Sequence, residues 1–316
     1  MKKSCLFQLV LFAVLVFVVA MLLRGYVEGC RAPQEARDID GEVGGDEGGE
    51  SAVSSQEGEQ GAGTTGSRGI EGLSRLPVSS LMIDAPRVRG LAVSEHFFYV
   101  SSFDPDRRVA SLYKVNRESH STTQVRTLKE DARYQSGGLF FRGGSLLVPL
   151  AGDEADSGSS ILFLDAHHLE IQHRIKVDDR IRAVAQGRHD LIYGVDFDSS
   201  VFYAWTPEGE EVRKGENYNW GEYGDIDFIQ GSLVCSGADD HSGVIDVIDP
   251  HTFTLLVRHR CYTRTPDREW VTSKGFAFFD GVFYFVPDEG HFPTLMKYVL
   301  DGVSPSEYIP YVAPKT

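Results

Sequence analysis

The sequence predicts an all-β fold, namely a β-propeller of five blades with four antiparallel strands each. Five segments of roughly 45 residues repeat the same order of short apolar strands and polar turns, a period typical of propeller blades. No stretch of useful length after residue 75 has the 3.6-residue periodicity of a helix. The alternative is a six-bladed ring with irregular blades. The repeats are clearest at the first strand of each blade, expected at Arg89–Val93, Gly137–Phe141, Ile181–Ala185, Asp225–Ile229 and Lys274–Phe278.

The second blade shows why four strands are expected. Gly137–Phe141 is its first strand, and the following Arg-Gly-Gly is a hairpin turn because glycine tolerates the positive φ that such turns need. The next three strands follow at Ser145–Leu150, Ser160–Asp165 and Glu170–Val177. One more strand from near a chain end has to close the ring. Two segments are candidates for it, Val78–Ile83 and Tyr308–Val312.

The residues before the propeller predict a membrane anchor and a tether. Residues 5–23 are apolar apart from Gln8, long enough to span a bilayer as a helix. Lys2 and Lys3 precede this run, so we expect a single-pass signal anchor over residues 1–30, with the propeller on the periplasmic side of the cell membrane. A cleavable signal peptide and a lipoprotein lipidated at Cys30 are the alternatives.

Residues 31–75 are rich in Gly, Asp and Glu and predict a disordered linker, which leaves residues 76–316 for the propeller. The chain carries a net charge of −15, which argues against nucleic acid as a partner. Cys235 and Cys261 fall on the second and fourth strands of one blade. Strands two positions apart are separated by roughly 9.5 Å, too far for a disulfide, so both thiols are expected to be unbridged.

Six short motifs stand out in the second and third blades: Gly137-Gly138, Val148-Pro149, Ser160-Ile161, Val177-Asp178-Asp179, Gly194-Val195 and Phe202–Trp205. With these motifs the chain resembles an exported bacterial β-propeller family of unknown function. More distantly, the chain is similar to NHL-repeat and gluconolactonase-like propellers. The resemblance implies the fold but no activity. Where that family has His-Pro before the paired glycines, this chain has Gln135-Ser136.

Alternating strand directions sort the loops of a propeller onto two faces. We call the four strands of a blade a to d, from the axis outward. The d–a and b–c connections emerge on one face, the d–a face, and the a–b and c–d turns emerge on the other, the a–b face. Because propellers usually bind ligands over the channel where the innermost strands begin, the d–a face is the expected site.

Acidic, basic and aromatic residues are expected to meet at the d–a mouth of the channel. Such a group could bind a zwitterion or a carboxylate, or form an ion network that seals the channel. Aromatic side chains with polar atoms are typical of ligand walls and interfaces. The candidate ligand-binding residues are Arg89, Arg182, Asp225, Asp227 and Lys274 at the inner strands, with Tyr134, Ser136, Trp220, Tyr223 and Trp270 in or beside the d–a connections.

Two neighbouring b–c loops are candidates for a divalent-cation site. Each combines carboxylates with one histidine, a ligand set that suits Ca²⁺ or Mn²⁺ and leaves Zn²⁺ possible. The other b–c loops are acidic as well, and aspartates that stabilise turns would explain the pattern equally. The candidate ligands are Asp239, Asp240 and His241 in the fourth blade and Asp288, Glu289 and His291 in the fifth.

The sequence lacks the Gly-x-Ser-x-Gly, His-Glu-x-x-His and phosphate-loop motifs, so no residue is assigned a catalytic role. The first hypothesis is therefore a non-enzymatic binding module, with the d–a face turned to an envelope protein or a small ligand. The alternative is a divalent-cation-dependent hydrolase or lactonase resembling the gluconolactonase-type propellers.

Overall fold

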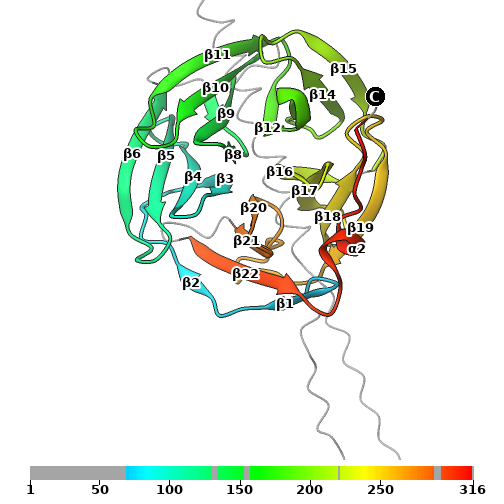
Figure 1. The fold of residues 1–316 in the computed structure, drawn as a ribbon. Helices are drawn as coiled ribbons and strands as arrows, with labels where there is room; N and C mark the ends of the chain where they lie inside the picture. The colour runs from blue at the N-terminus through cyan, green and yellow to red at the C-terminus, as the bar shows by residue number, and fades with distance from the viewer. Residues whose placement is uncertain (1–68, 130–133, 153–156, 220, 288–292, 315–316) are drawn as a thin grey trace, which may run out of the picture. The chain divides into compact units, whose positions relative to one another are not determined.

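The computed structural model describes residues 69–129, 134–152, 157–219, 221–287 and 293–314. Five antiparallel sheets surround a central axis, as Figure 1 shows, which confirms the five-bladed count. Helical structure in these ranges is limited to a 3₁₀ turn, η1 (Arg188–Asp190), and a short helix, α2 (Pro305–Tyr308). None of the described helices is long and apolar enough to cross a membrane. The apolar run 5–23, Cys30 and most of the expected linker lie outside the described ranges.

The first four blades follow one another along the chain, each from its innermost to its outermost strand. Blade 1 holds β3 (Val88–Val93), β4 (Phe97–Asp104), β5 (Val109–Asn116) and β6 (Thr122–Lys129). Blade 2 holds β7 (Tyr134–Ser136) and β8 (Phe140–Arg142), both paired with β9 (Ser145–Gly152), then β10 (Ser159–Asp165) and β11 (Ile171–Val177). Blade 3 holds β12 (Ile181–Gln186), β13 (Ile192–Asp196), β14 (Val201–Trp205) and β15 (Glu211–Glu216). Blade 4 holds β16 (Glu222–Ile229), β17 (Ser232–Ala238), β18 (Gly243–Ile248) and β19 (Leu255–Cys261).

Blade 5 combines the two ends of the described chain. Its inner strands are β20 (Gly275–Phe279), β21 (Val282–Val286) and β22 (Thr294–Leu300). The outer edge of β22 pairs with β1 (Leu73–Arg75) and β2 (Ser79–Ser80), so the candidate segment Val78–Ile83 contributes to the closure. The other candidate, Tyr308–Val312, forms no strand. Because β1 precedes residue 76, the folded domain begins inside the stretch expected to be linker.

The paired glycines of blade 2 interrupt its innermost strand where blades 2 and 3 meet. Gly138 N–H donates to the Arg182 carbonyl at 2.8 Å, which joins the two inner strands directly. A Cβ on Gly138 would stand 2.2 Å from Oδ1 of Asp225. The expected strand Gly137–Phe141 is therefore split into β7 and β8, because only glycine allows this close approach.

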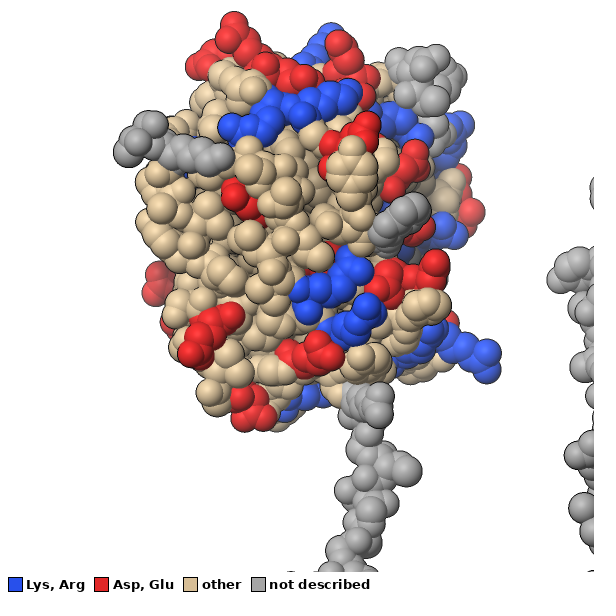
Figure 2. Space-filling model, turned by 90° about the vertical axis from the view of Figure 1, so that its right-hand side faces the viewer, with Lys and Arg blue, Asp and Glu red and all other residues tan. Residues whose placement is uncertain are grey.

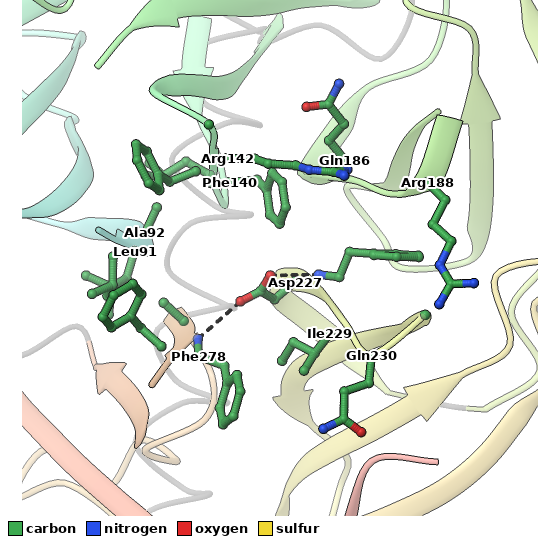
Figure 3. A pocket seen from close by; sticks show the side chains of 18 residues that line it. Leu91, Ala92, Phe140, Arg142, Gln186, Arg188, Asp227, Ile229, Gln230 and Phe278 are labelled. Carbon is green, nitrogen blue, oxygen red and sulfur yellow. Dashed lines mark hydrogen bonds between the residues drawn. The ribbon is translucent and has the colours of Figure 1, made fainter. Parts of the chain in front are cut away.

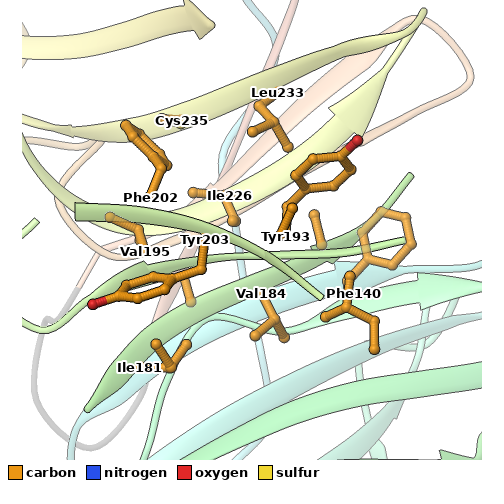
Figure 4. Close-up of a cluster of buried hydrophobic side chains, with 14 of the residues drawn as sticks. Phe140, Ile181, Val184, Tyr193, Val195, Phe202, Tyr203, Ile226, Leu233 and Cys235 are labelled. Atoms are coloured by element: carbon orange, nitrogen blue, oxygen red, sulfur yellow. The ribbon is translucent and has the colours of Figure 1, made fainter. Parts of the chain in front are cut away.

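Apolar side chains fill the spaces between neighbouring blades. Figure 4 shows one such cluster, in which Val184 and Tyr193 of blade 3 lie with Ile226 and Leu233 of blade 4. Cys235 belongs to the same cluster, and both Cys235 and Cys261 are buried free thiols, as expected. On the side of the propeller shown in Figure 2, acidic and basic side chains are interspersed among uncharged ones.

Candidate ligand site in the central channel

At the d–a end, the channel is almost closed. Arg89, Ser136, Arg182 and Lys274 do lie together there, as the repeat pattern predicts, but the space between them is only about 10 Å³. The Arg182 guanidinium donates to the Phe197 carbonyl at 3.1 Å and lies 5.5 Å from the centre of its ring. Burial lowers the pKa of Arg182. These contacts hold Arg182 against blade 3 and contribute to the closure of this mouth.

Asp225 lies deeper in the channel and is fully buried. Its Oδ2 accepts hydrogen bonds from Leu91 N–H at 2.9 Å and Phe276 N–H at 3.0 Å, and its Oδ1 accepts one from Ile226 N–H at 3.0 Å. Burial raises the pKa of Asp225 well above its usual value, against the effect of these hydrogen bonds. Because Leu91 and Phe276 belong to blades 1 and 5, this carboxyl group connects three blades.

The a–b end of the channel is open. A cavity of about 590 Å³ lies between the far ends of all five inner strands, shown in Figure 3. Asp227 faces it and is partly exposed. Its Oδ1 accepts from Phe228 N–H at 2.7 Å and its Oδ2 from Phe278 N–H at 3.1 Å. Burial raises the pKa of Asp227 to about 6.

Polar side chains surround the opening of this cavity. Arg142 ends β8, Gln186 ends β12, Arg188 follows in η1 and Gln230 occupies the β16–β17 turn. The Arg142 guanidinium donates to the Gly187 carbonyl, and the Arg188 guanidinium lies 5.0 Å from the ring centre of Tyr311. In Figure 3 these four side chains, together with Phe140 and Phe278, lie around Asp227.

The aromatic residues expected at a ligand wall have other environments. Tyr223 is fully buried and donates its hydroxyl to Asp246 at 2.5 Å. Trp270 is half-buried, with the Arg264 guanidinium 3.6 Å from its ring centre. Neither ring faces the channel cavity. Tyr134 is the first residue of β7, and Trp220 lies outside the described ranges.

The described ranges include the fourth-blade half of the expected cation site. Asp239 Oδ1 accepts from the backbone N–H groups of His241 and Ser242, and its Oδ2 pairs with Arg258 at 3.3 Å and Arg260 at 3.1 Å. Asp239 is thus engaged in a turn and in two ion pairs, whereas Asp240 and His241 are exposed. No group of three potential ligands capable of holding a metal ion occurs within the described ranges. Asp288, Glu289 and His291 lie outside them.

Most residues of the a–b site were not predicted, because they lie at the second ends of the inner strands and the predicted site residues lie at the starts. Arg142 and Gln230 directly precede the hairpin glycines Gly143 and Gly231. Gln186 and Arg188 occupy the corresponding place in blade 3. Following each predicted inner strand to its second end would have found all four. Asp227 was identified, but it was assigned to the opposite mouth.

Comparison with known proteins supports the fold and gives no activity. No protein-family model matches the chain, and no curated protein matches it. The glutaminyl cyclase of Myxococcus xanthus has a similar structure, with a TM-score of 0.55 and 13% sequence identity over 72% of this chain and 96% of that one. A protein of unknown function from Bacteroides caccae gives a TM-score of 0.44 and 14% identity over 65% and 72% of the two chains. BamB from Moraxella catarrhalis gives 0.39 and 11% identity over 69% and 61%.

Proposed function

We propose that this protein is a membrane-anchored, periplasmic ligand-binding propeller whose ligand enters the channel from the a–b face. The cavity of about 590 Å³ at that end is the observation that carries the proposal, because it falls in the range of small-molecule sites, roughly 300–1,000 Å³. Apolar walls and a few convergent polar groups are typical of such sites. The d–a mouth, first expected to be the binding face, is filled by its own side chains.

The pocket can be tested by obstructing it. Gln186→Trp places a large ring at the opening, and Gln172→Trp makes the same change on the exposed outer strand β11 as a matched control. Pooled polar metabolites would be screened by saturation-transfer NMR on the full chain in detergent micelles. We expect at least one compound to bind the wild type and Gln172→Trp but not Gln186→Trp. If every bound compound is insensitive to Gln186→Trp, the pocket is not the site.

The anchor and periplasmic location rest on residues 1–30 and need their own test. A fluorescent protein that folds only in the cytoplasm and an alkaline phosphatase active only in the periplasm would be fused in turn after residue 316. We expect phosphatase activity in the membrane fraction and no fluorescence. The reverse result would place the propeller in the cytoplasm and exclude the proposed topology.

A hydrolase is the second candidate, and one observation favours it. The cavity contains a carboxyl group, Asp227, with a pKa of about 6, near the value useful for general acid–base catalysis at neutral pH. If ester or lactone substrates are turned over by the wild type and by Gln172→Trp but not by Asp227→Asn, the protein is an enzyme. Binding without turnover supports the binding module.

A further inference from the structure

The floor of the cavity offers a negative charge that no described Lys or Arg neutralises. Each carboxylate oxygen of Asp227 accepts one backbone N–H, and a carboxylate has about four acceptor positions. Among the described residues, no Lys or Arg forms an ion pair with Asp227. Two acceptor positions therefore remain for a donor that enters the cavity, and a cationic donor would supply the missing charge.

The walls favour an organic cation over a hydrated metal ion. Phe140, Phe228 and Phe278 line the cavity with Leu91 and Ile229. Aromatic faces attract ammonium groups and pack against apolar chains, but they offer no oxygen ligands to a metal. The ligand that fits is an ammonium group attached to an apolar body.

The rim carries the opposite charge. Arg142 and Arg188 are each held by one contact, to the Gly187 carbonyl and the Tyr311 ring, and a guanidinium has five N–H donors. Both therefore retain donors for a carboxylate at the opening. Asp227 lies two residues before Ile229, the last residue of β16, and the turn with Gln230 follows, so the rim lies roughly 7–10 Å above Asp227 at about 3.3 Å per strand residue.

We propose that this cavity binds a small zwitterion with an apolar middle, its ammonium group on Asp227 and its carboxylate on Arg142 and Arg188. This inference rests on the proposed function of the a–b pocket. A free α-amino acid carries both charges on one carbon and cannot span the depth of the cavity. An extended tripeptide spans roughly 10 Å, at about 3.3–3.6 Å per residue, and has the required separation.

Four probes test the proposal by calorimetry on the full chain. Trileucine carries both charges, N-acetyl-trileucine lacks the ammonium group, trileucine amide lacks the carboxylate, and 8-aminooctanoate has both charges without peptide bonds. Acetylation should weaken binding to the wild type by about tenfold or more, and binding to Asp227→Asn by less than about twofold. Amidation should weaken binding to the wild type more than binding to Arg188→Gln. If both 8-aminooctanoate and trileucine bind in separate titrations, the cavity recognises zwitterions in general. If only trileucine binds, the ligand is a short peptide.

A pH series on the wild type gives a second measurement if Asp227→Asn fails to fold. Only the ionised carboxylate attracts an ammonium group, so trileucine should bind more weakly as the pH falls from 7.5 to 5, through the Asp227 pKa of about 6. Equal affinity for free and acetylated trileucine, or no binding of any probe, overturns the zwitterion. If a different ligand then binds the wild type but not Gln186→Trp, the proposed ligand-binding function of the pocket is retained and only the zwitterion proposal fails. If no such ligand is found, both proposals fail.

Discussion

Asp225 and Asp227 lie two residues apart on β16, so their side chains face the same way, toward the axis. They accept hydrogen bonds from Phe276 N–H and Phe278 N–H, which lie two residues apart on β20. The two carboxyl groups thus connect blade 4 to blade 5 at two levels of the channel. The upper group is enclosed by protein and serves the fold alone, whereas the lower one also faces the open cavity.

Asp227 should make the stability of the protein depend on pH. Its pKa in the folded state is about 6, above its ordinary value of 3.8, so its contribution is fully present below about pH 3.8 and is lost as the pH rises through 6. At about 1.36 kcal/mol per pKa unit, the loss is on the order of 3 kcal/mol. Between pH 4 and 7.5, wild type should therefore lose stability relative to Asp227→Asn in urea unfolding. A pH-independent difference between the two proteins would contradict this.

For individual side chains, the sequence predicted which of them reach the channel. It did not predict which end of the channel is open. The repeat register was sufficient to place Arg89, Arg182 and Lys274 around one mouth. Closure of that mouth depends on Phe197, which comes from a different strand connection of blade 3 and packs beside Arg182. Such packing between separate loops leaves no periodic trace in a sequence. The buried position of Tyr223 was not predicted for the same reason, because its hydrogen-bond partner Asp246 lies on another strand.

At the scale of elements, segment 301–314 packs against the fourth blade without joining its sheet. His259 Nε2 lies 2.8 Å from the Tyr308 carbonyl oxygen, and the two rings stack with centroids 3.6 Å apart. Ser232 Oγ donates to the Pro310 carbonyl, and Tyr311 reaches Arg188 at the cavity rim. Its part Tyr308–Val312 was expected as a possible closing strand, and instead the segment lies along one side of the a–b opening.

Two tyrosines of this segment should differ sharply in their contribution to stability. Tyr308 is 2% exposed and Tyr311 is 58% exposed. Truncating a buried aromatic ring costs about 3–5 kcal/mol, so Tyr308→Ala should lower the free energy of unfolding by that amount. Tyr311→Ala should change it by less than about 0.5 kcal/mol. Equal losses in the two variants, measured by urea unfolding, would show that the segment is not anchored through Tyr308.

For the whole molecule, the repeat period predicted the number of blades, and the distance between the second and fourth strands of a blade predicted the two unbridged cysteines. The closing strand was less predictable because β1 and β2 are short and consist mostly of polar residues. Leu73 is one of few apolar residues in a stretch rich in Gly and Glu. Composition assigned this stretch to the linker, and only pairing with β22 makes it part of the propeller.

The blades should differ in local stability. The outer edge of blade 5 is held by short pairings of β22 with β1 and β2, whereas inner strands such as β12 and β16 are enclosed by neighbouring blades. Amide hydrogen exchange tracks local opening. In hydrogen–deuterium exchange mass spectrometry, peptides covering 70–82 should therefore exchange before those covering β12 and β16. Uniform exchange over all five blades would indicate a single cooperative unit.

The pairing of Leu73 with Leu300 also has a consequence for how the protein is made. During synthesis, β1 emerges long before its partner β22, so the ring cannot close until almost the whole chain is available. Until then the edge of β1 has no partner, and contacts so distant in sequence form slowly. An incomplete ring exposes strand edges and apolar blade faces that are prone to aggregation. Chains interrupted in blade 5 should therefore be targets for chaperones and proteases.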